Sequence, residues 1–138
     1  MIRLVNLSKN WGDFVLNGVN LTVQDNEYFV ILGPTGAGKT VLLELIAGMY
    51  PPDAGEIWIN DCNVTGKYPE ERNIGFVYQD YLLFPHLQVK DNILFGLKIR
   101  KAPRHTMKSA LEQMVALLGI GHLLDRYPAA LSGGEQQR

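Results

Sequence analysis

Several features that would narrow the role of this 138-residue chain are scarce in it. The single cysteine, Cys62, excludes an internal disulfide and has no second cysteine with which to hold a metal cluster. Such cysteine usage is typical of a reducing, cytosolic compartment. No apolar stretch reaches the ~20 residues that a membrane span requires, and Met1 to Leu4 lack the apolar core of a signal peptide. Any link to a membrane is therefore expected to go through a partner.

An excess of charge of either sign is also absent. The chain has 13 basic and 14 acidic residues, and its net charge is -1. We therefore expect no electrostatic attraction to nucleic acid, and a small anion would need a local site. A hydrophobic content of 46% is enough to build the core of one modest domain.

The pattern of apolar and polar residues predicts an α/β fold with three zones. Residues 1–27 and 54–65 are predicted to form a small antiparallel β part, because short runs alternate between apolar and polar residues. Residues 28–53 and 72–82 are predicted to form an α/β core. Residues 83–138 are predicted to form a helical part.

Within the β part, strands are predicted at residues 2–7, 14–16 and 19–23. The dipeptide Asn17-Gly18 between the last two predicts a hairpin turn, because both residues tolerate the positive φ that such turns require. The segment Glu56 to Ile59, followed by the turn residues Asn60-Asp61, is predicted to return to this sheet.

The core and the helical part show longer patterns. Residues 28–32 and 74–78 are almost continuously apolar, which is typical of parallel strands buried on both faces. An apolar stripe after Lys39 predicts a helix that Gly48 ends. A second stripe predicts a helix from Thr106 that ends at Gly119, and its apolar face is expected to pack into the core.

The central motif is Gly33-Pro34-Thr35-Gly36-Ala37-Gly38-Lys39-Thr40, between a predicted strand and a predicted helix. It matches G-x-x-x-x-G-K-[ST], in which backbone N–H groups surround phosphates at a helix N-terminus. Glycines 33, 36 and 38 are predicted to adopt conformations that other residues avoid, so that successive amides point inward. Lys39 is predicted to reach the β and γ phosphates and Thr40 to bind Mg²⁺. Val41 completes the predicted phosphate-loop contacts.

The glycine motif alone does not establish nucleotide binding or the reaction, for two reasons. A glycine-rich turn between a strand and a helix could carry the same glycines without a ligand. Kinases, GTPases, helicases and transporter motors also share the motif, so it indicates a nucleotide without fixing the reaction.

Two further segments narrow the class. Gln79 directly follows residues 74–78, and the chain closes with Leu131-Ser132-Gly133-Gly134-Glu135-Gln136. Together they resemble the Q-loop and the signature motif of ATP-binding cassette (ABC) ATPases. The resemblance implies that Gln79 acts beside Mg²⁺ and the attacking water, with Lys39 as the second catalytic residue. It also implies that residues 132–135 cover ATP held by a second ATPase subunit in a head-to-tail dimer.

A local explanation exists for part of this motif. Ser132 and Glu135 have the spacing of a capping box, which satisfies amides at a helix start without any ligand. That explanation does not account for Gly133 and Gly134, which cost backbone entropy in a first helical turn. An exposed helix start with two glycines is suited to a close approach by an anion.

Two apolar sites are interpreted through the same resemblance. Trp11 stands where the family places an aromatic residue that stacks on adenine, and its π face suits that role. It could equally be an edge-strand aromatic packed on the small sheet. The segment Tyr81-Leu82-Leu83-Phe84-Pro85-His86-Leu87 stands where the family receives a helix of the membrane subunit, with core packing as the alternative.

Within the family, residues 28–48 and 75–81 are most similar to the ATPase subunits of molybdate and tungstate importers, although sulfate, polyamine and sugar importers have similar segments. The resemblance implies ATP and Mg²⁺ as ligands and integral membrane permease subunits as further partners. It implies a cytoplasmic location on the inner face of the cell membrane.

The family's apolar strand ending in Asp-Glu, the Walker B motif, and its switch histidine do not occur in the 138 residues. We therefore expect the C-terminal half of the ATPase domain to be missing and this chain alone not to hydrolyse ATP. Two other classes remain open: a soluble ABC ATPase that acts in DNA repair or on ribosomes, and a non-catalytic nucleotide-binding fragment. A P-loop kinase would not explain residues 131–135.

Overall fold

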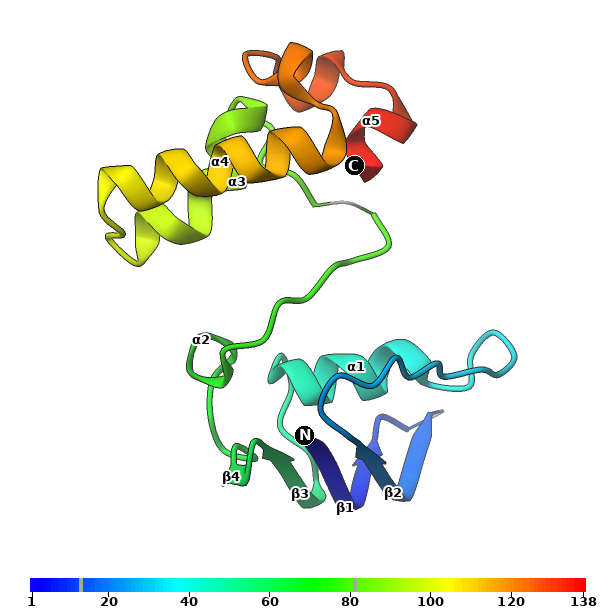
Figure 1. Ribbon diagram of the computed structural model, residues 1–138. Coiled ribbons are helices and arrows are strands. Elements are labelled where there is room, and N and C mark those ends of the chain that lie inside the picture. Colours follow the sequence, from blue (N-terminus) through cyan, green and yellow to red (C-terminus); the bar gives the residue numbers. More distant parts are fainter. Residues whose placement is uncertain (13, 81) are drawn as a thin grey trace. The chain divides into compact units, whose positions relative to one another are not determined.

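The computed structural model describes residues 1–12, 14–80 and 82–138 (Figure 1). The chain divides into two compact units, unit 1 (Met1–Phe76) and unit 2 (Val77–Arg138). Tyr81, which belongs to the predicted docking segment, lies outside the described residues.

Unit 1 contains an antiparallel sheet with the strand order β2-β1-β3-β4 (Figure 1). Its strands are β1 (Ile2–Asn10), β2 (Val15–Val23), β3 (Ala54–Ile59) and β4 (Cys62–Asn63). The predicted return of the chain to this sheet is confirmed, because β3 pairs with β1. Asn60 and Asp61 have φ values of 47° and 61° and make the tight turn between β3 and β4.

The hairpin turn predicted at Asn17-Gly18 is wrong. β2 runs through both residues, and the chain reverses between Asn10 and Val15 instead. The register with β1 shifts beside this dipeptide, Gly18 has a φ of 59°, and its amide donates to Ser8 Oγ at 2.9 Å. The dipeptide therefore marks a β-bulge, which has the same need for positive φ as a hairpin turn.

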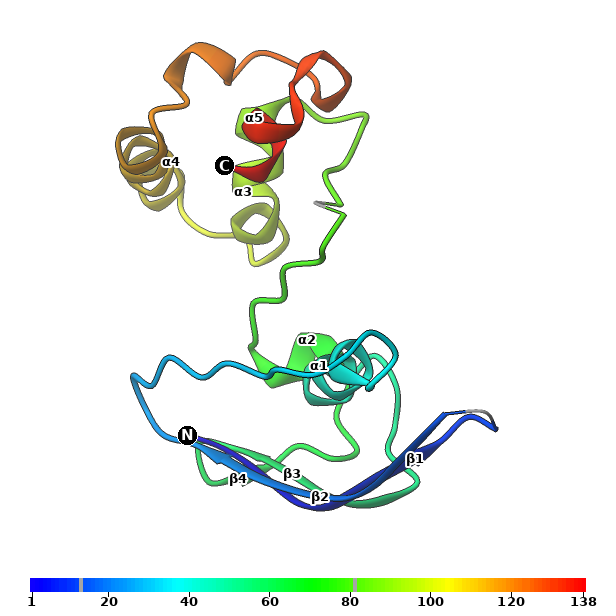
Figure 2. The same cartoon turned by 90° about the vertical axis from the view of Figure 1, so that its right-hand side faces the viewer.

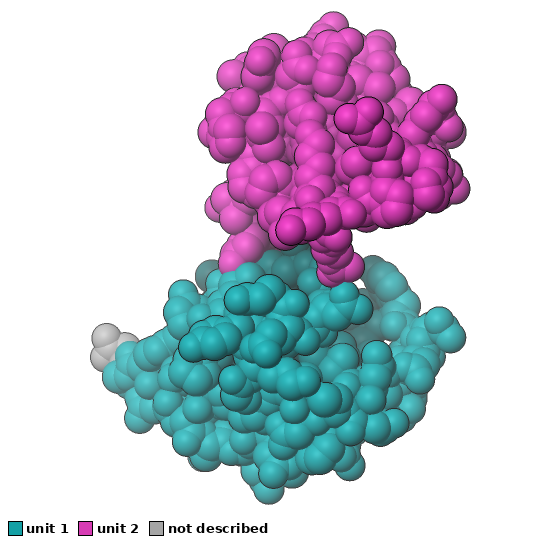
Figure 3. All heavy atoms as spheres, turned by 90° about the vertical axis from the view of Figure 1, so that its left-hand side faces the viewer, with its two compact units in different colours: residues 1–76 teal, residues 77–138 magenta. Residues whose placement is uncertain are grey.

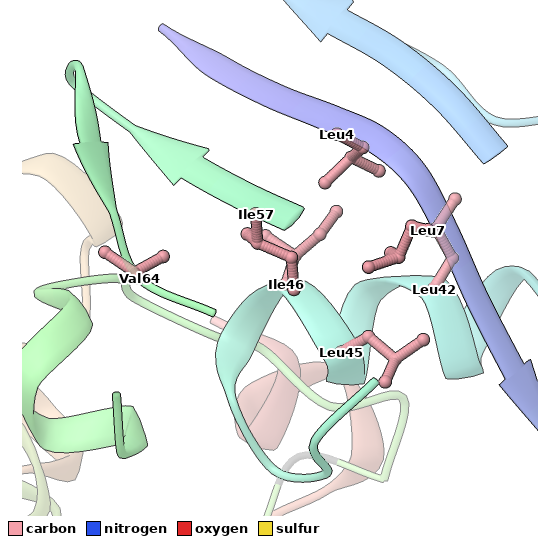
Figure 4. Packing of buried hydrophobic residues seen from close by; sticks show 7 residues of the cluster. All are labelled: Leu4, Leu7, Leu42, Leu45, Ile46, Ile57 and Val64. Carbon is pink, nitrogen blue, oxygen red and sulfur yellow. The ribbon is translucent and has the colours of Figure 1, made fainter. Parts of the chain in front are cut away.

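Helix α1 (Lys39–Ala47) lies across one face of the sheet (Figures 2 and 4). The core between them consists of Leu4, Leu7, Leu42, Leu45, Ile46, Ile57 and Val64. The predicted helix end is confirmed: Gly48 has a φ of 87°, and its amide donates to the carbonyl of Leu45 at 3.2 Å. A left-handed glycine at this position ends a helix without steric cost.

Arg72, at the end of the short helix α2 (Pro69–Arg72), is buried with 4% of its surface exposed. Its Nη1 donates to the carbonyls of Leu45 at 2.8 Å and Ile46 at 3.0 Å, in the last turn of α1. Its Nε and Nη2 donate to the carbonyls of Lys67 at 2.9 Å and Thr65 at 3.2 Å. Burial lowers the pKa of this guanidinium, but arginine stays protonated in proteins. The side chain thus joins the end of α1 to the segment after β4.

The two predicted core strands are not formed. Neither residues 28–32 nor residues 74–78 belong to a strand of the described structure, and Tyr28, Leu32 and Val77 are 94%, 87% and 89% exposed. A strand requires neighbours that take up its N–H and C=O groups, and the sheet of the described residues consists of β1 to β4. The apolar composition of these two segments therefore indicates a preference for burial, but it does not by itself form a strand of a sheet.

Unit 2 (magenta in Figure 3) is built from helices. They are α3 (Val89–Ile99), α4 (Arg104–Leu118) and α5 (Gly133–Gln137), with 3-10 turns at Gly121–Leu123 and Pro128–Ala130. The helix predicted from Thr106 is confirmed as part of α4, and Gly119 ends it with a φ of 66°. Its apolar face is only partly buried. Among the described residues, no helix is both long and apolar enough to span a membrane.

We expect Arg72→Leu to destabilise unit 1. The substitution leaves four buried or partly buried carbonyls without their donor, and the expected loss of unfolding free energy is about 2–4 kcal/mol. Urea denaturation followed by circular dichroism measures it. Arg72→Lys should fall in between, because an ammonium reaches fewer carbonyls. Equal stability of Arg72→Leu and the wild type would contradict this role.

Candidate nucleotide-binding site

The glycine loop of residues 33–38 leads directly into α1, whose first residue is Lys39. Gly36 and Gly38 have φ values of 83° and 85°, as predicted for a loop that turns its amides inward. The same prediction is wrong for Gly33, which is not among the residues with positive φ. A Cβ on Gly33 would lie 3.4 Å from Ala37 Cβ, an ordinary van der Waals contact, so neither backbone conformation nor packing requires glycine at this position.

The Lys39 ammonium bends back over the loop. Its Nζ donates to the carbonyl of Gly33 at 2.9 Å and to that of Pro34 at 2.7 Å. An ammonium has three donors, so a further oxygen can be bound without breaking either contact. A positive charge and the unpaired amides of a helix N-terminus suit a phosphate ligand.

The remaining loop residues differ in what they can offer. Pro34, Thr35 and Thr40 are exposed, whereas the Val41 side chain packs against the core of unit 1. Any contact of Val41 with a ligand would therefore be made by its backbone in the first turn. The Thr40 hydroxyl could be one ligand of a Mg²⁺ ion, which usually takes its other oxygens from phosphates and water. Among the described residues, no three His, Cys, Asp or Glu side chains gather into a metal site.

Phe14 is a contact of the loop that the sequence did not indicate. A Cβ on Gly38 would lie 2.2 Å from Phe14 Cζ, so the ring occupies the space that any other side chain at 38 would need. The carbonyl of Phe14 accepts a hydrogen bond from the Trp11 amide at 2.9 Å. Phe14, which precedes β2, is thus packed directly on the phosphate loop. Only the three-dimensional structure reveals this contact, because Phe14 has no motif around it.

Trp11 lies between β1 and β2 and keeps 42% of its surface exposed. Its ring meets that of Tyr50 edge to face, with centroids 4.8 Å apart and planes at 85°. Lys9 Nζ lies 5.6 Å from the indole centroid. The Trp11 backbone is thus linked through Phe14 to the phosphate loop, while stacking of its ring on adenine stays a prediction.

Gln79 and residues 132–135 belong to unit 2. That Gln79 lies beside the Mg²⁺ of a bound nucleotide, and that residues 132–135 cover ATP held by a second subunit, both stay predictions. Gln79 is exposed. Ser132 and Glu135 form the predicted capping box at the start of α5: the amide and the hydroxyl of Ser132 each donate to Glu135 Oε2 at 2.7 Å. A Cβ on Gly133 or Gly134 would meet no atom within 4 Å, so packing within the chain does not require these glycines.

The described part of the predicted docking segment, residues 82–87, is held against α3. The Asn92 side chain accepts from the Phe84 amide at 2.8 Å and donates to the Leu87 carbonyl at 3.0 Å. The centroids of the Phe84 and Phe95 rings lie 4.1 Å apart. Core packing thus accounts for part of the segment, while Leu82 remains largely exposed.

A sheet covered by a helix that starts at a phosphate loop, followed by a helical unit that carries a second glycine motif, defines an ATP-binding cassette ATPase fold. Residues 16–138 match the family model described as ABC transporter, and the chain belongs to this family. A solved dimeric bacterial ABC transporter cassette confirms the predicted fold, with a TM-score of 0.84 and 28% sequence identity. The match covers 99% of this chain and 66% of the solved chain.

Two curated relatives extend the comparison. A molybdate/tungstate import ATP-binding protein of Pyrococcus abyssi is 49% identical over 138 residues, which is all of this chain and 40% of the relative. A sulfate/thiosulfate import ATP-binding protein of Gloeobacter violaceus is 46% identical and matches 99% of this chain and 40% of its own length. The chain therefore spans about two fifths of the curated relatives it matches.

We expect the capping box to weaken in acid. The hydrogen bonds from the Ser132 hydroxyl and amide lower the pKa of Glu135. Because the folded pKa is depressed, this contribution to stability is present above the unfolded value of about 4.3 and is lost as the pH falls through the folded pKa. NMR titration of the Glu135 carboxyl group measures the shift.

Ser132→Ala should return the pKa of Glu135 toward its ordinary value, because the hydroxyl donor is lost. Ser109→Ala, in the middle of α4, is the matched control and should leave the Glu135 titration unchanged. An unshifted Glu135 in the wild type would contradict the capping box.

Proposed function

We propose that this chain is the ATP-binding part of an ABC importer ATPase, and that the whole protein couples ATP binding and hydrolysis to the transport of a small solute. The observation that carries the proposal is the placement of the Lys39 ammonium over a glycine loop at the start of α1. The import ATP-binding relatives support the same function. The proposal assigns ATP binding to this chain and hydrolysis to the whole protein.

Each part of ATP would have its own contact. The loop amides of residues 33–41 and the Lys39 ammonium would hold the triphosphate, where a fixed positive charge also stabilises a transferred γ-phosphoryl group. Thr40, with Gln79 from unit 2, would contribute to Mg²⁺ binding. Trp11 would stack on adenine, and Gln79 would orient the attacking water.

The second ATPase subunit would complete the site. In a head-to-tail dimer, Ser132, Gly133, Gly134 and Glu135 of one subunit would cover the γ-phosphate on the loop of the other. The open space around both glycines supports this assignment, because among the described residues no atom lies within 4 Å of a Cβ at either position. Dimeric cassettes among the solved relatives are consistent with it.

The cargo would be an oxyanion of the molybdate or tungstate type. The relatives above are named for molybdate and tungstate, and for sulfate and thiosulfate, which are all compact oxyanions. A maltose/maltodextrin import ATP-binding protein of Salmonella typhimurium is still 41% identical, so the cargo would be selected mainly by other subunits. These would be membrane permeases, with the ATPase on the cytoplasmic side of the cell membrane.

We expect Lys39→Ala to weaken ATP binding at least about tenfold, because a charged contact to phosphate is worth roughly 1.5–3 kcal/mol. Isothermal titration calorimetry with Mg²⁺ and ATP measures the affinity. Lys108→Ala, an exposed lysine on α4, is the matched control and should bind as the wild type does. Unchanged ATP affinity of Lys39→Ala would refute the phosphate site.

A further inference from the structure

We propose that Tyr50 is a positioning residue for the nucleobase, and that it acts by holding the Trp11 ring in the orientation that stacks on the base. This inference rests on the proposed function, because it requires that unit 1 binds a nucleotide. It adds a second aromatic residue, from the segment after α1, to the base-binding part of the site.

The contact between the two rings is specific in its geometry. Their centroids are 4.8 Å apart and their planes stand at 85°, an edge-to-face arrangement that aromatic pairs favour. Both residues are 42% exposed, so the pair lies at the surface where a ligand can reach it. Rings that are exposed to this extent are not fixed by burial. The contact between the two rings gives each of them a preferred orientation.

The backbone restricts Tyr50 from both sides. Gly48, two residues before Tyr50, ends α1 with a φ of 87°. The Arg72 side chain packs against Gly48, and its Nε would lie 2.4 Å from a Cβ at that position. Pro51, directly after it, disfavours a helical conformation at Tyr50. Tyr50 is therefore presented from a segment with little conformational freedom.

A second side chain contacts the indole. Lys9 Nζ lies 5.6 Å from the Trp11 ring centroid and 2.7 Å from Asp53 Oδ1. The other oxygen of Asp53 accepts from the Asn10 amide at 2.7 Å, and the Asp53 amide donates to the Ser8 carbonyl at 2.9 Å. The lysine beside the indole is thus held by a carboxylate that is itself bound to β1.

Phe14 links the Trp11 backbone to the phosphate loop. The Trp11 amide bonds to the Phe14 carbonyl, and the Phe14 ring packs on Gly38. A ring fixed by Tyr50 would meet the base of a nucleotide whose phosphates lie on the loop. Ordering of one side chain before binding is expected to improve affinity roughly three- to tenfold.

Calorimetric titrations of the full chain with ATP and with inorganic tripolyphosphate, which has no base, test the inference. Tyr50→Leu should weaken ATP binding about three- to tenfold and leave tripolyphosphate binding unchanged. Tyr50→Phe should bind ATP as the wild type does, because it keeps the ring. Tyr28→Leu, at an exposed tyrosine of the same unit, is the matched control and should change neither affinity.

A double-mutant cycle separates positioning from direct contact. If Tyr50 acts through the indole, Tyr50→Leu should have no further effect on ATP affinity in a Trp11→Leu background. Additive losses would overturn the inference, as would tighter ATP binding by Tyr50→Leu or an equal loss of ATP and tripolyphosphate. If the wild type binds neither ligand, the proposed function itself fails, a result distinct from all of these.

Discussion

The hydrogen bonds of the buried Arg72 guanidinium are the interactions on which the rest of unit 1 depends. The guanidinium takes up two carbonyls at the end of α1 and two more from the segment after β4, so it fixes the helix against the chain that follows the sheet. A cation at a helix C-terminus is also favoured by the helix dipole. Because α1 begins at the phosphate loop, holding its last turn also holds the loop at its first turn.

The opposite end of α1 is fixed by packing. Phe14 fills the space over Gly38, and its backbone carries the hydrogen bond from Trp11. Between the two ends, Leu42, Leu45 and Ile46 are buried against the sheet. The helix therefore cannot shift along the sheet without breaking polar contacts at one end or ring packing at the other, and this rigidity is what preorganises an anion site.

The sequence predicted the features that depend on local chemistry. The positive φ of Gly36 and Gly38, the helix end at Gly48 and the capping box of Ser132 and Glu135 are set by residues a few positions apart, and the structure contains all three. The bulge at Asn17-Gly18 was predicted as a turn because both structures need the same positive φ, and only pairing with β1 distinguishes them.

What could not be predicted depends on distant parts of the chain. The bonds of Arg72 to α1 span 26 and 27 positions, and no periodicity identifies such a pair. Residues 28–32 and 74–78 have the composition of core strands, but a strand exists only beside its neighbours. The family comparisons place the fold, while the contact of Phe14 with Gly38 and that of Trp11 with Tyr50 come from the structure alone.

The central claim is that unit 1 binds a nucleotide, with its phosphates on the loop at the start of α1 and its base at Trp11. The most direct measurement is an amide NMR titration of the full chain with Mg²⁺ and ATP. The account predicts that the signals of Gly36 to Thr40 and the Trp11 indole N–H shift together, while the Trp58 indole, in β3, does not. Unmoved loop amides at saturating ATP, or a response at Trp58 in place of Trp11, would contradict it.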